Sequence, residues 1–438
     1  MADKIIQCGY MSGDTYSAAA LLAADPGMRI ILVKDTKAAG QYADKSGLIQ
    51  KIYAESGVKD RVTLLDISTT TVNIVDLWKS VSEAFRDQTP QPDALSTAAL
   101  VGIQRRLCND VEPKRRWPRS ITAVTGLLAT QWTTRREATI AAVAKAWKIG
   151  KLPTEQKFAL YEYMGQMFAK TGFDIRPNIV VLWSRQSGKR GGAHPELDSS
   201  YAAIRQLARR FAEVDMRATV VLAGDEKNTK MADFAHGKPH IVNATNMWEA
   251  PVWRTMFGEA TFLAQFAFYK YLAGDYNVVH VGMRSGMLES MALLGMTTFY
   301  LEGQDSGSGD RMLTFSRAGI PYARVQIVDA PGLTGRISEV QKLHTMERLQ
   351  SSLDRLANAN MNRGGFSRNF SGPRVPTVDT SWAAKNYAKA KLLDIPLDDD
   401  RYKTRDRWTK IKDDMSEQRG LRNSDVDTIV RLVAGTFK

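Results

Sequence analysis

Short apolar runs alternate with longer stretches of helical pattern in the first part of the chain. Each apolar run ends at a turn rich in Gly, Ser or Asp, which is typical of buried strands. Strands are predicted at residues 4–8, 28–33, 61–67 and 121–128, and helices at 14–24, 48–55, 72–85, 136–147 and 154–170. Strands that alternate with helices over short links indicate a parallel sheet with right-handed crossovers.

The same alternation begins again after Pro177. Strands are predicted at residues 179–183, 218–223, 240–242, 278–281, 297–301 and 323–328, and helices at 338–357, 381–393 and 426–436. The pattern predicts an α/β protein with two Rossmann-like domains, at residues 1–176 and 177–335, that face each other across a cleft. A helical tail at 336–438 is expected to pack back on them. In such folds, ligands bind outside the carboxyl ends of the strands.

Length and composition are those of an ordinary globular protein. The chain has 438 residues, 44% hydrophobic and 24% charged, which favours more than one domain. It has no apolar run of about 18 residues, so we expect no transmembrane helix. The N-terminus reaches Gly9 and Asp14 too soon for a signal peptide. The two cysteines, Cys8 and Cys108, fit a reducing compartment, and we expect a cytoplasmic protein.

Charge adds one expectation about partners. The net charge of +13 indicates attraction to an acidic partner or to nucleic acid. Residues 101–150 are especially basic. A solvated basic face explains such a run, and the alternative is a surface that faces phosphate, nucleic acid or lipid. No aromatic interleaving typical of RNA-binding modules is present. The five histidines have no metal-site spacing, so no metal is expected.

The stretch from Tyr276 to Arg317 carries the most specific chemistry. A strand runs into a turn at Ser285 and Gly286 and then into a helix, and the N–H groups at such a helix N-terminus attract phosphate. Glu289 is expected either to accept a hydrogen bond from a ribose hydroxyl or to cap its own helix. Arg284 and Arg311 add positive charge, and the Gly- and Ser-rich loop at 303–310 is a candidate lid.

The second half resembles the donor-binding domain of GT-B glycosyltransferases. The resemblance rests on the basic loop SRQSGKRGGAHPE at residues 184–196 and on GMRSGMLESMALLG at 282–295. The loop is most similar to that of the fucosyltransferase and protein O-fucosyltransferase group, whose usual His and apolar residue are replaced here by Trp183 and Ser184. The resemblance implies metal-independent transfer of a sugar from a nucleotide-sugar donor, linked to GDP or UDP, to an acceptor that the sequence does not identify. No cofactor is implied.

The resemblance also implies roles for single residues. Arg185 is expected to bind the donor diphosphate, with Lys189 and Arg190 as helpers, because a guanidinium binds phosphate through two N–H groups. Asp225 is interpreted either as a nucleoside contact or as a turn residue. Asp14 is interpreted as the general base or as a helix N-cap.

Two other functions stay open from the sequence. Another nucleotide-binding enzyme can be built on the same double fold, and so can a basic protein without catalytic activity that binds nucleic acid or has a structural role. Fold alone does not choose among these functions.

His280 lies inside a strand and is interpreted as a core residue.

Overall fold

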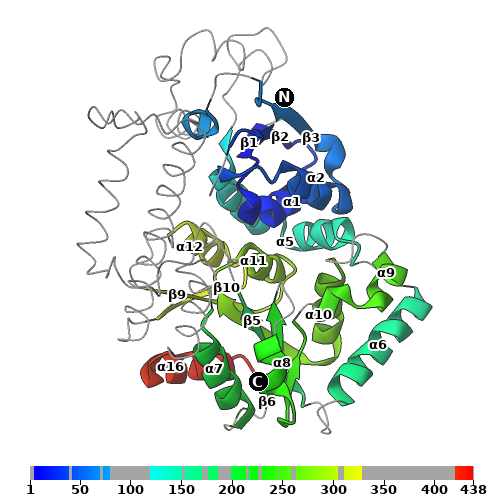
Figure 1. The fold of residues 1–438 in the computed structure, drawn as a ribbon, viewed down its shortest axis with the longest axis vertical. Coiled ribbons are helices and arrows are strands. Elements are labelled where there is room, and N and C mark those ends of the chain that lie inside the picture. The colour runs from blue at the N-terminus through cyan, green and yellow to red at the C-terminus, as the bar shows by residue number, and fades with distance from the viewer. Residues whose placement is uncertain are drawn as a thin grey trace, which may run out of the picture. The chain divides into compact units, whose positions relative to one another are not determined.

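A computed structural model describes residues 4–38, 42–69, 73–78, 119–149, 153–169, 176–185, 199–213, 216, 218–224, 229–245, 247–257, 263–303, 310–327 and 420–437. The chain divides into two units. The first comprises Met1–Arg185, Leu207–Ile327 and Asp427–Lys438, and it contains both β-sheets (Figure 1). The second comprises Gln186–Gln206 and Val328–Val426. Within it, the Gln206 amide bonds the backbone of Leu421 through both its oxygen and its nitrogen.

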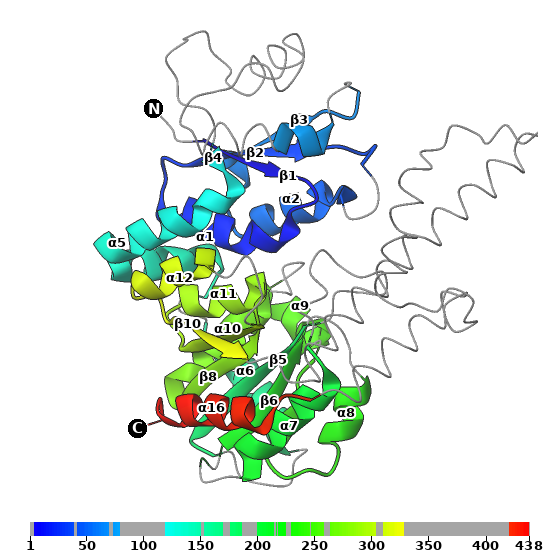
Figure 2. The same cartoon turned by 90° about the vertical axis from the view of Figure 1, so that its left-hand side faces the viewer.

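The first sheet has four strands in the order β3-β2-β1-β4. They are β1 (Lys4–Cys8), β2 (Arg29–Lys34), β3 (Val62–Asp66) and β4 (Arg119–Ser120), and all pairs are parallel. Helices α1 (Thr15–Ala24), α2 (Ser46–Glu55) and α5 (Val124–Ala146) lie on one face, as Figure 2 shows. Alternation along β1 fits this layering: Ile5 packs in the core that includes α1, whereas Ile6 and Cys8 pack in a separate cluster.

The strand predicted at residues 121–128 is wrong. Residues 121–123 form a 3-10 turn, and helix α5 begins at Val124. The buried side chains here are Ile121, Val124, Thr125 and Leu128. Their spacing of i, i+3, i+4 and i+7 matches one face of a helix, so packing outweighs the β-propensity of this apolar run.

The second sheet has six parallel strands in the order β10-β9-β8-β5-β6-β7. The strands are β5 (Asn178–Ser184), β6 (Ala218–Gly224), β7 (Ile241–Asn243), β8 (Asn277–Met283), β9 (Thr298–Gly303) and β10 (Tyr322–Ile327). The helices are α6 (Thr154–Ala169), α7 (Tyr201–Glu213), α8 (Thr229–Ala235), α9 (Pro251–Phe257), α10 (Leu263–Asp275), α11 (Gly286–Leu293), α12 (Asp310–Arg317) and α16 (Asn423–Ala434). Arg210 of α7 forms an ion pair with Asp427 of α16 at 2.6 Å.

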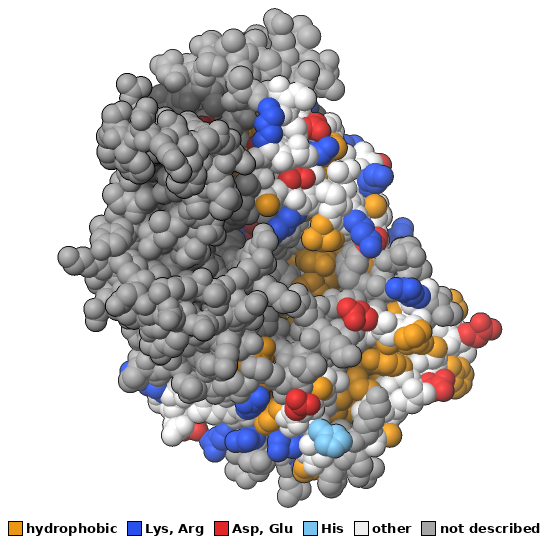
Figure 3. Space-filling view, viewed as in Figure 1, with side chains coloured by type: hydrophobic (Ala, Val, Ile, Leu, Met, Phe, Trp, Pro, Cys, Tyr) orange, Lys and Arg blue, Asp and Glu red, His pale blue; other side chains and the backbone are white. Residues whose placement is uncertain are grey.

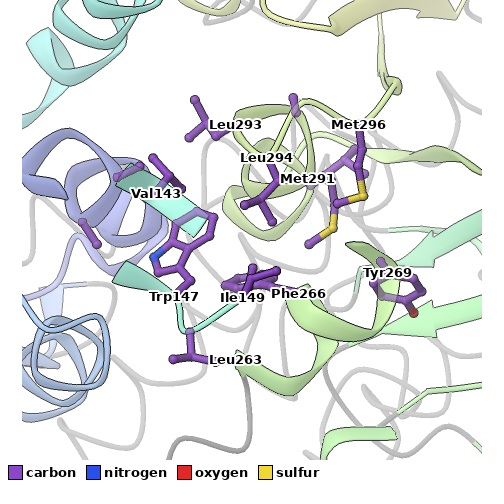
Figure 4. Close-up of a cluster of buried hydrophobic side chains, with 14 of the residues drawn as sticks. Val143, Trp147, Ile149, Leu263, Phe266, Tyr269, Met291, Leu293, Leu294 and Met296 are labelled. Carbon is purple, nitrogen blue, oxygen red and sulfur yellow. The ribbon is translucent and has the colours of Figure 1, made fainter. Parts of the chain in front are cut away.

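One apolar core joins the helices of the two sheets. Figure 4 shows Trp147, just after α5, beside Phe266 of α10, and their rings lie 4.7 Å apart. Helix α11 is buried from Leu288 through Leu293 and belongs to the same cluster, as do α1 and α5. Because this core is continuous, the turn before α1 and the turn before α11 are held against each other.

The prediction of an α/β chain with two parallel sheets is confirmed. The first sheet is built from residues 4–120 and the second from 178–327. The domain boundaries and the packing of the tail stay predictions, and the tail helices predicted at 338–357 and 381–393 lie outside the described residues. None of the helices in the described part of the chain is both long and apolar enough to cross a bilayer.

Candidate functional site

Two strand-to-helix turns meet at the carboxyl ends of β1 and β8. The first turn leads through Gly13 and Asp14 into α1, and the second leads through Ser285 into α11. A Cβ atom on Gly286 would lie 2.2 Å from the carbonyl oxygen of Gly13. Only glycine fits this backbone contact, so the first residue of α11 is fixed against the turn that precedes α1.

The N-terminus of α11 is capped from within. The Ser285 hydroxyl accepts a hydrogen bond from the Leu288 N–H at 3.2 Å. The N–H groups of Gly286 and Met287 lie in the first turn, where helix geometry provides no partner inside the helix. Ser285, Gly286 and Met287 are all partly exposed. No backbone hydrogen bond within the described residues uses these two N–H groups. They can therefore meet an anion, together with the positive end of the helix dipole.

Asp14 and Arg311 form an ion pair at this junction. Nη2 of Arg311, on α12, donates to Oδ1 of Asp14 at 2.7 Å. Asp14 occupies the N-cap position of α1, but its side chain makes no capping hydrogen bond. Burial lowers the pKa of Arg311, but the charges of Asp14 and Glu289 outweigh that effect and raise it. The pair brings together two predicted site residues that lie far apart in sequence.

Glu289 lies behind that pair and is 5% exposed. Its Oε2 accepts a hydrogen bond from the Ser17 hydroxyl of α1 at 2.8 Å, a partner that neither of its expected roles includes. Burial raises the pKa of Glu289 to about 7, and the negative charge of Asp14 adds to this effect. Arg311, the Ser17 hydrogen bond and Arg284 act in the opposite direction. A carboxyl group with such a pKa changes its charge near neutral pH.

Arg284 belongs to a buried ion network on the second sheet. Its Nη1 lies 3.0 Å from Oε1 of Glu302, and Arg324 lies 3.1 Å from the other oxygen of the same carboxylate. The Glu302 side chain is fully buried. Both guanidinium groups pair with the same carboxylate. Arg284 is held in place by Glu302, and its charge lowers the pKa of Glu289.

Arg185 follows directly after β5, next to β8 in the sheet. Trp183 pairs with Gly282 in the strand register, so Arg185 and Arg284 leave the two strands at the same level. Ser184, the last residue of β5, has a buried hydroxyl without a hydrogen-bond partner in the described part of the chain.

Several predicted residues cannot be placed relative to this junction. Lys189, Arg190 and Asp225 lie outside the described residues, as does most of the candidate lid at 303–310. Within the residues that the structure describes, no group of acidic, His or Cys side chains has the arrangement of a metal site. Asp14, Glu289 and Arg311 come together, with Ser285 and Gly286 beside them at the α11 N-terminus.

The interpretation of His280 as a core residue is confirmed. The side chain is fully buried, and its Nδ1 accepts a hydrogen bond from the Trp183 indole at 3.1 Å. Burial lowers the pKa of His280 to about 3. The imidazole is therefore neutral near pH 7 and serves packing on the inner face of the sheet.

Three residues of the junction were not foreseen: Ser17, Glu302 and Arg324. Ser17 stands among alanines in a helix that is buried at most positions, and a small polar residue in such surroundings requires a partner. Glu302 and Arg324 are the charged residues of strands whose other members are uncharged. A buried charge in a strand needs an opposite charge nearby, and that signal could have revealed the network.

Basic side chains also gather away from the junction. On the face shown in Figure 3, Lys and Arg side chains lie around α7 and α8. The guanidinium of Arg209 and the ammonium of Lys238 lie 5.7 Å and 5.5 Å from the ring centre of Phe234. Of the basic stretch at residues 101–150, residues 101–118 lie outside the described part of the chain. The nucleic-acid partner therefore stays a prediction.

Comparisons with known proteins add no family to these observations. No protein-family model, no curated protein and no solved structure matches the chain.

Proposed function

We propose that the chain is a metal-independent glycosyltransferase of the GT-B class. It moves a sugar from a nucleotide-sugar donor, carried on GDP or UDP, to an acceptor. The two sheets act as the acceptor side and the donor side, in the order in which they occur in the sequence. The resemblance of residues 184–196 and 282–295 to GT-B donor domains is what favours this class over other nucleotide-binding enzymes.

One observation carries the proposal: the turn before α11 meets the turn before α1 at the carboxyl ends of parallel strands. Ligands of doubly wound folds bind at such strand ends. Here the α11 N-terminus, a half-buried Arg311 and a half-buried Asp14 adjoin one another. Helix N–H groups and a guanidinium suit a diphosphate, and a carboxylate suits a proton acceptor.

Each group then has a role in transfer. Arg185 and the first turn of α11 bind the diphosphate and stabilise the negative charge that develops as it leaves. Arg311 turns from Asp14 toward the diphosphate when the donor binds. Asp14, released from the ion pair, takes the proton of the acceptor hydroxyl as the new glycosidic bond forms. Electrostatic stabilisation by these cations does not require a divalent ion.

Thermal protection by nucleotides tests this proposal. Melting temperature is measured with UDP, GDP and a short RNA, each in the presence of a metal chelator and at low and high salt. A ligand at one hundred times its dissociation constant stabilises the folded state by about 2.7 kcal/mol. We expect UDP or GDP to raise the melting temperature, and we expect Arg185→Ala to remove most of that increase.

Arg209→Ala serves as the matched control. It removes an exposed guanidinium on α7, which lies over the ring of Phe234 on α8. It should leave nucleotide protection unchanged. The proposal is refuted if neither nucleotide protects the protein. If RNA alone protects, and its effect weakens with salt as counterion release requires, the chain is instead a basic nucleic-acid-binding protein.

A further inference from the structure

The second layer of the junction contains a carboxyl group that the transfer reaction does not use. Glu289 is almost fully buried behind the Asp14 and Arg311 pair, and it is anchored to α1 by the Ser17 hydroxyl at 2.8 Å. It is thus too deep to act as the group that contacts an acceptor. Its position lets it act on the ligand through charge.

Charged and titratable groups from several elements surround Glu289 in the described part of the chain. Asp14 precedes α1, Arg311 lies on α12, and Arg284 follows β8. The strands β9 and β10 add Tyr300, Glu302, Tyr322 and Arg324. Tyr300 and Tyr322 stack with ring centres 4.4 Å apart, and both hydroxyls are buried without a hydrogen-bond partner in the described part of the chain.

The charge of this set depends on Glu289. Glu289 is the fourth residue of α11, and its carboxyl group interacts with the charges of Arg311, Asp14 and Arg284. When Glu289 is ionised, a buried negative charge lies close behind the α11 N-terminus. When it is protonated, that negative charge is absent. A diphosphate at this helix end is therefore repelled by the ionised form and not by the protonated form.

We propose that the site binds its diphosphate ligand together with one proton, and that Glu289 is the residue that takes up this proton. Ser17 lowers the proton affinity of this group by donating to its carboxylate. The inference rests on the proposed function, because it assumes that the junction binds a diphosphate. The Glu289 pKa of about 7 is consistent with it, since the group then exchanges its proton near neutral pH.

Linkage gives the expected size of the effect. If the ligand binds only the protonated form and the pKa is about 7, the dissociation constant rises about twenty-five-fold between about pH 6.5 and about pH 8.5. The phosphates of the ligand also titrate, near pH 6. Comparison with a variant that cannot take up the proton removes that contribution.

Titration calorimetry with GDP and UDP tests the inference. Binding is measured across this pH range in two buffers with different heats of ionisation, which counts the protons taken up. Glu289→Gln keeps an oxygen that can accept from Ser17 but has no titrating proton. We expect it to bind with an affinity that is nearly flat over the pH range in which the wild-type protein weakens.

Two further variants keep the result interpretable. Ser17→Ala keeps the carboxyl group and removes a hydrogen bond that lowers its pKa, so the pH at which binding weakens should move upward. Glu137→Gln removes an exposed carboxylate of α5 and should behave as the wild-type protein does.

The outcomes separate this inference from the function on which it rests. If neither nucleotide binds at any pH, the proposed function fails, and the inference fails with it. If a nucleotide binds without proton uptake, or if Glu289→Gln has the same pH dependence as the wild-type protein, the inference alone is wrong. An unchanged pH midpoint in Ser17→Ala contradicts the role of Ser17.

Discussion

Replacement of Glu289 by glutamine should make the protein more stable at alkaline pH. Glu289 is buried, and its pKa is raised from 4.5 to about 7, first by burial and then by the charge of Asp14. A carboxyl group with a raised pKa holds its proton more tightly in the folded state than in the unfolded chain. Folding therefore opposes its ionisation.

The sign and size follow from that difference. Below about pH 4.5 the group is protonated in both states and costs nothing. As pH rises toward 7, the unfolded chain ionises first, and the folded state loses stability relative to it. Above pH 7 the loss is complete and amounts to about 3 kcal/mol. This is a large fraction of the 5–15 kcal/mol that is typical of a folded domain.

Urea denaturation at a series of pH values measures this effect. The free energy of unfolding of Glu289→Gln should exceed that of the wild-type protein at pH 8 by up to about 3 kcal/mol, relative to their difference at pH 4.5. Glu137→Gln, on the exposed face of α5, should leave the pH dependence unchanged. A difference between Glu289→Gln and the wild-type protein that stays constant from pH 4.5 to pH 8 would show that the pKa of Glu289 is not raised in the folded state.

Two further predictions concern the junction and the core. Gly286→Ala should destabilise the protein by about 1–3 kcal/mol, because the new Cβ would meet the Gly13 carbonyl, whereas Gly126→Ala on α5 has open space and should be neutral or stabilising. Trp183→Phe should cost about 1–3 kcal/mol more than Trp147→Phe, since both indoles are buried but only that of Trp183 donates to His280. Denaturation curves measure both differences, and equal losses within either pair of variants would contradict these explanations.

The fold was largely readable from the sequence because its strands are short apolar runs in a parallel sheet. Such strands are buried on both faces and stand out from their flanking turns. The error at residues 121–128 arose where an apolar run fits both periods. The structure shows that Ile121, Val124 and Leu128 are buried. Only this burial pattern distinguishes the helical spacing of the run from the alternation of a strand.

The site was readable only in part. The turn at Ser285 and Gly286 carries a local signal, and the structure places it at a helix N-terminus. The pairing of Asp14 with Arg311 joins residues that are far apart in the chain, and no local pattern encodes it. Ser17 and Glu289 meet for the same reason: two helices from different sheets share one core.

We propose that the junction of the two turns, together with Arg185, serves transfer from a nucleotide sugar. The decisive experiment measures release of nucleoside diphosphate from a panel of GDP- and UDP-linked sugars in the presence of a metal chelator. We predict release from at least one donor by the wild-type protein and by Arg209→Ala, and loss of that activity in Arg185→Ala and Asp14→Asn. Activity that is equal in the wild-type protein and in Arg185→Ala, or absent with every donor and a range of acceptor sugars, would contradict it.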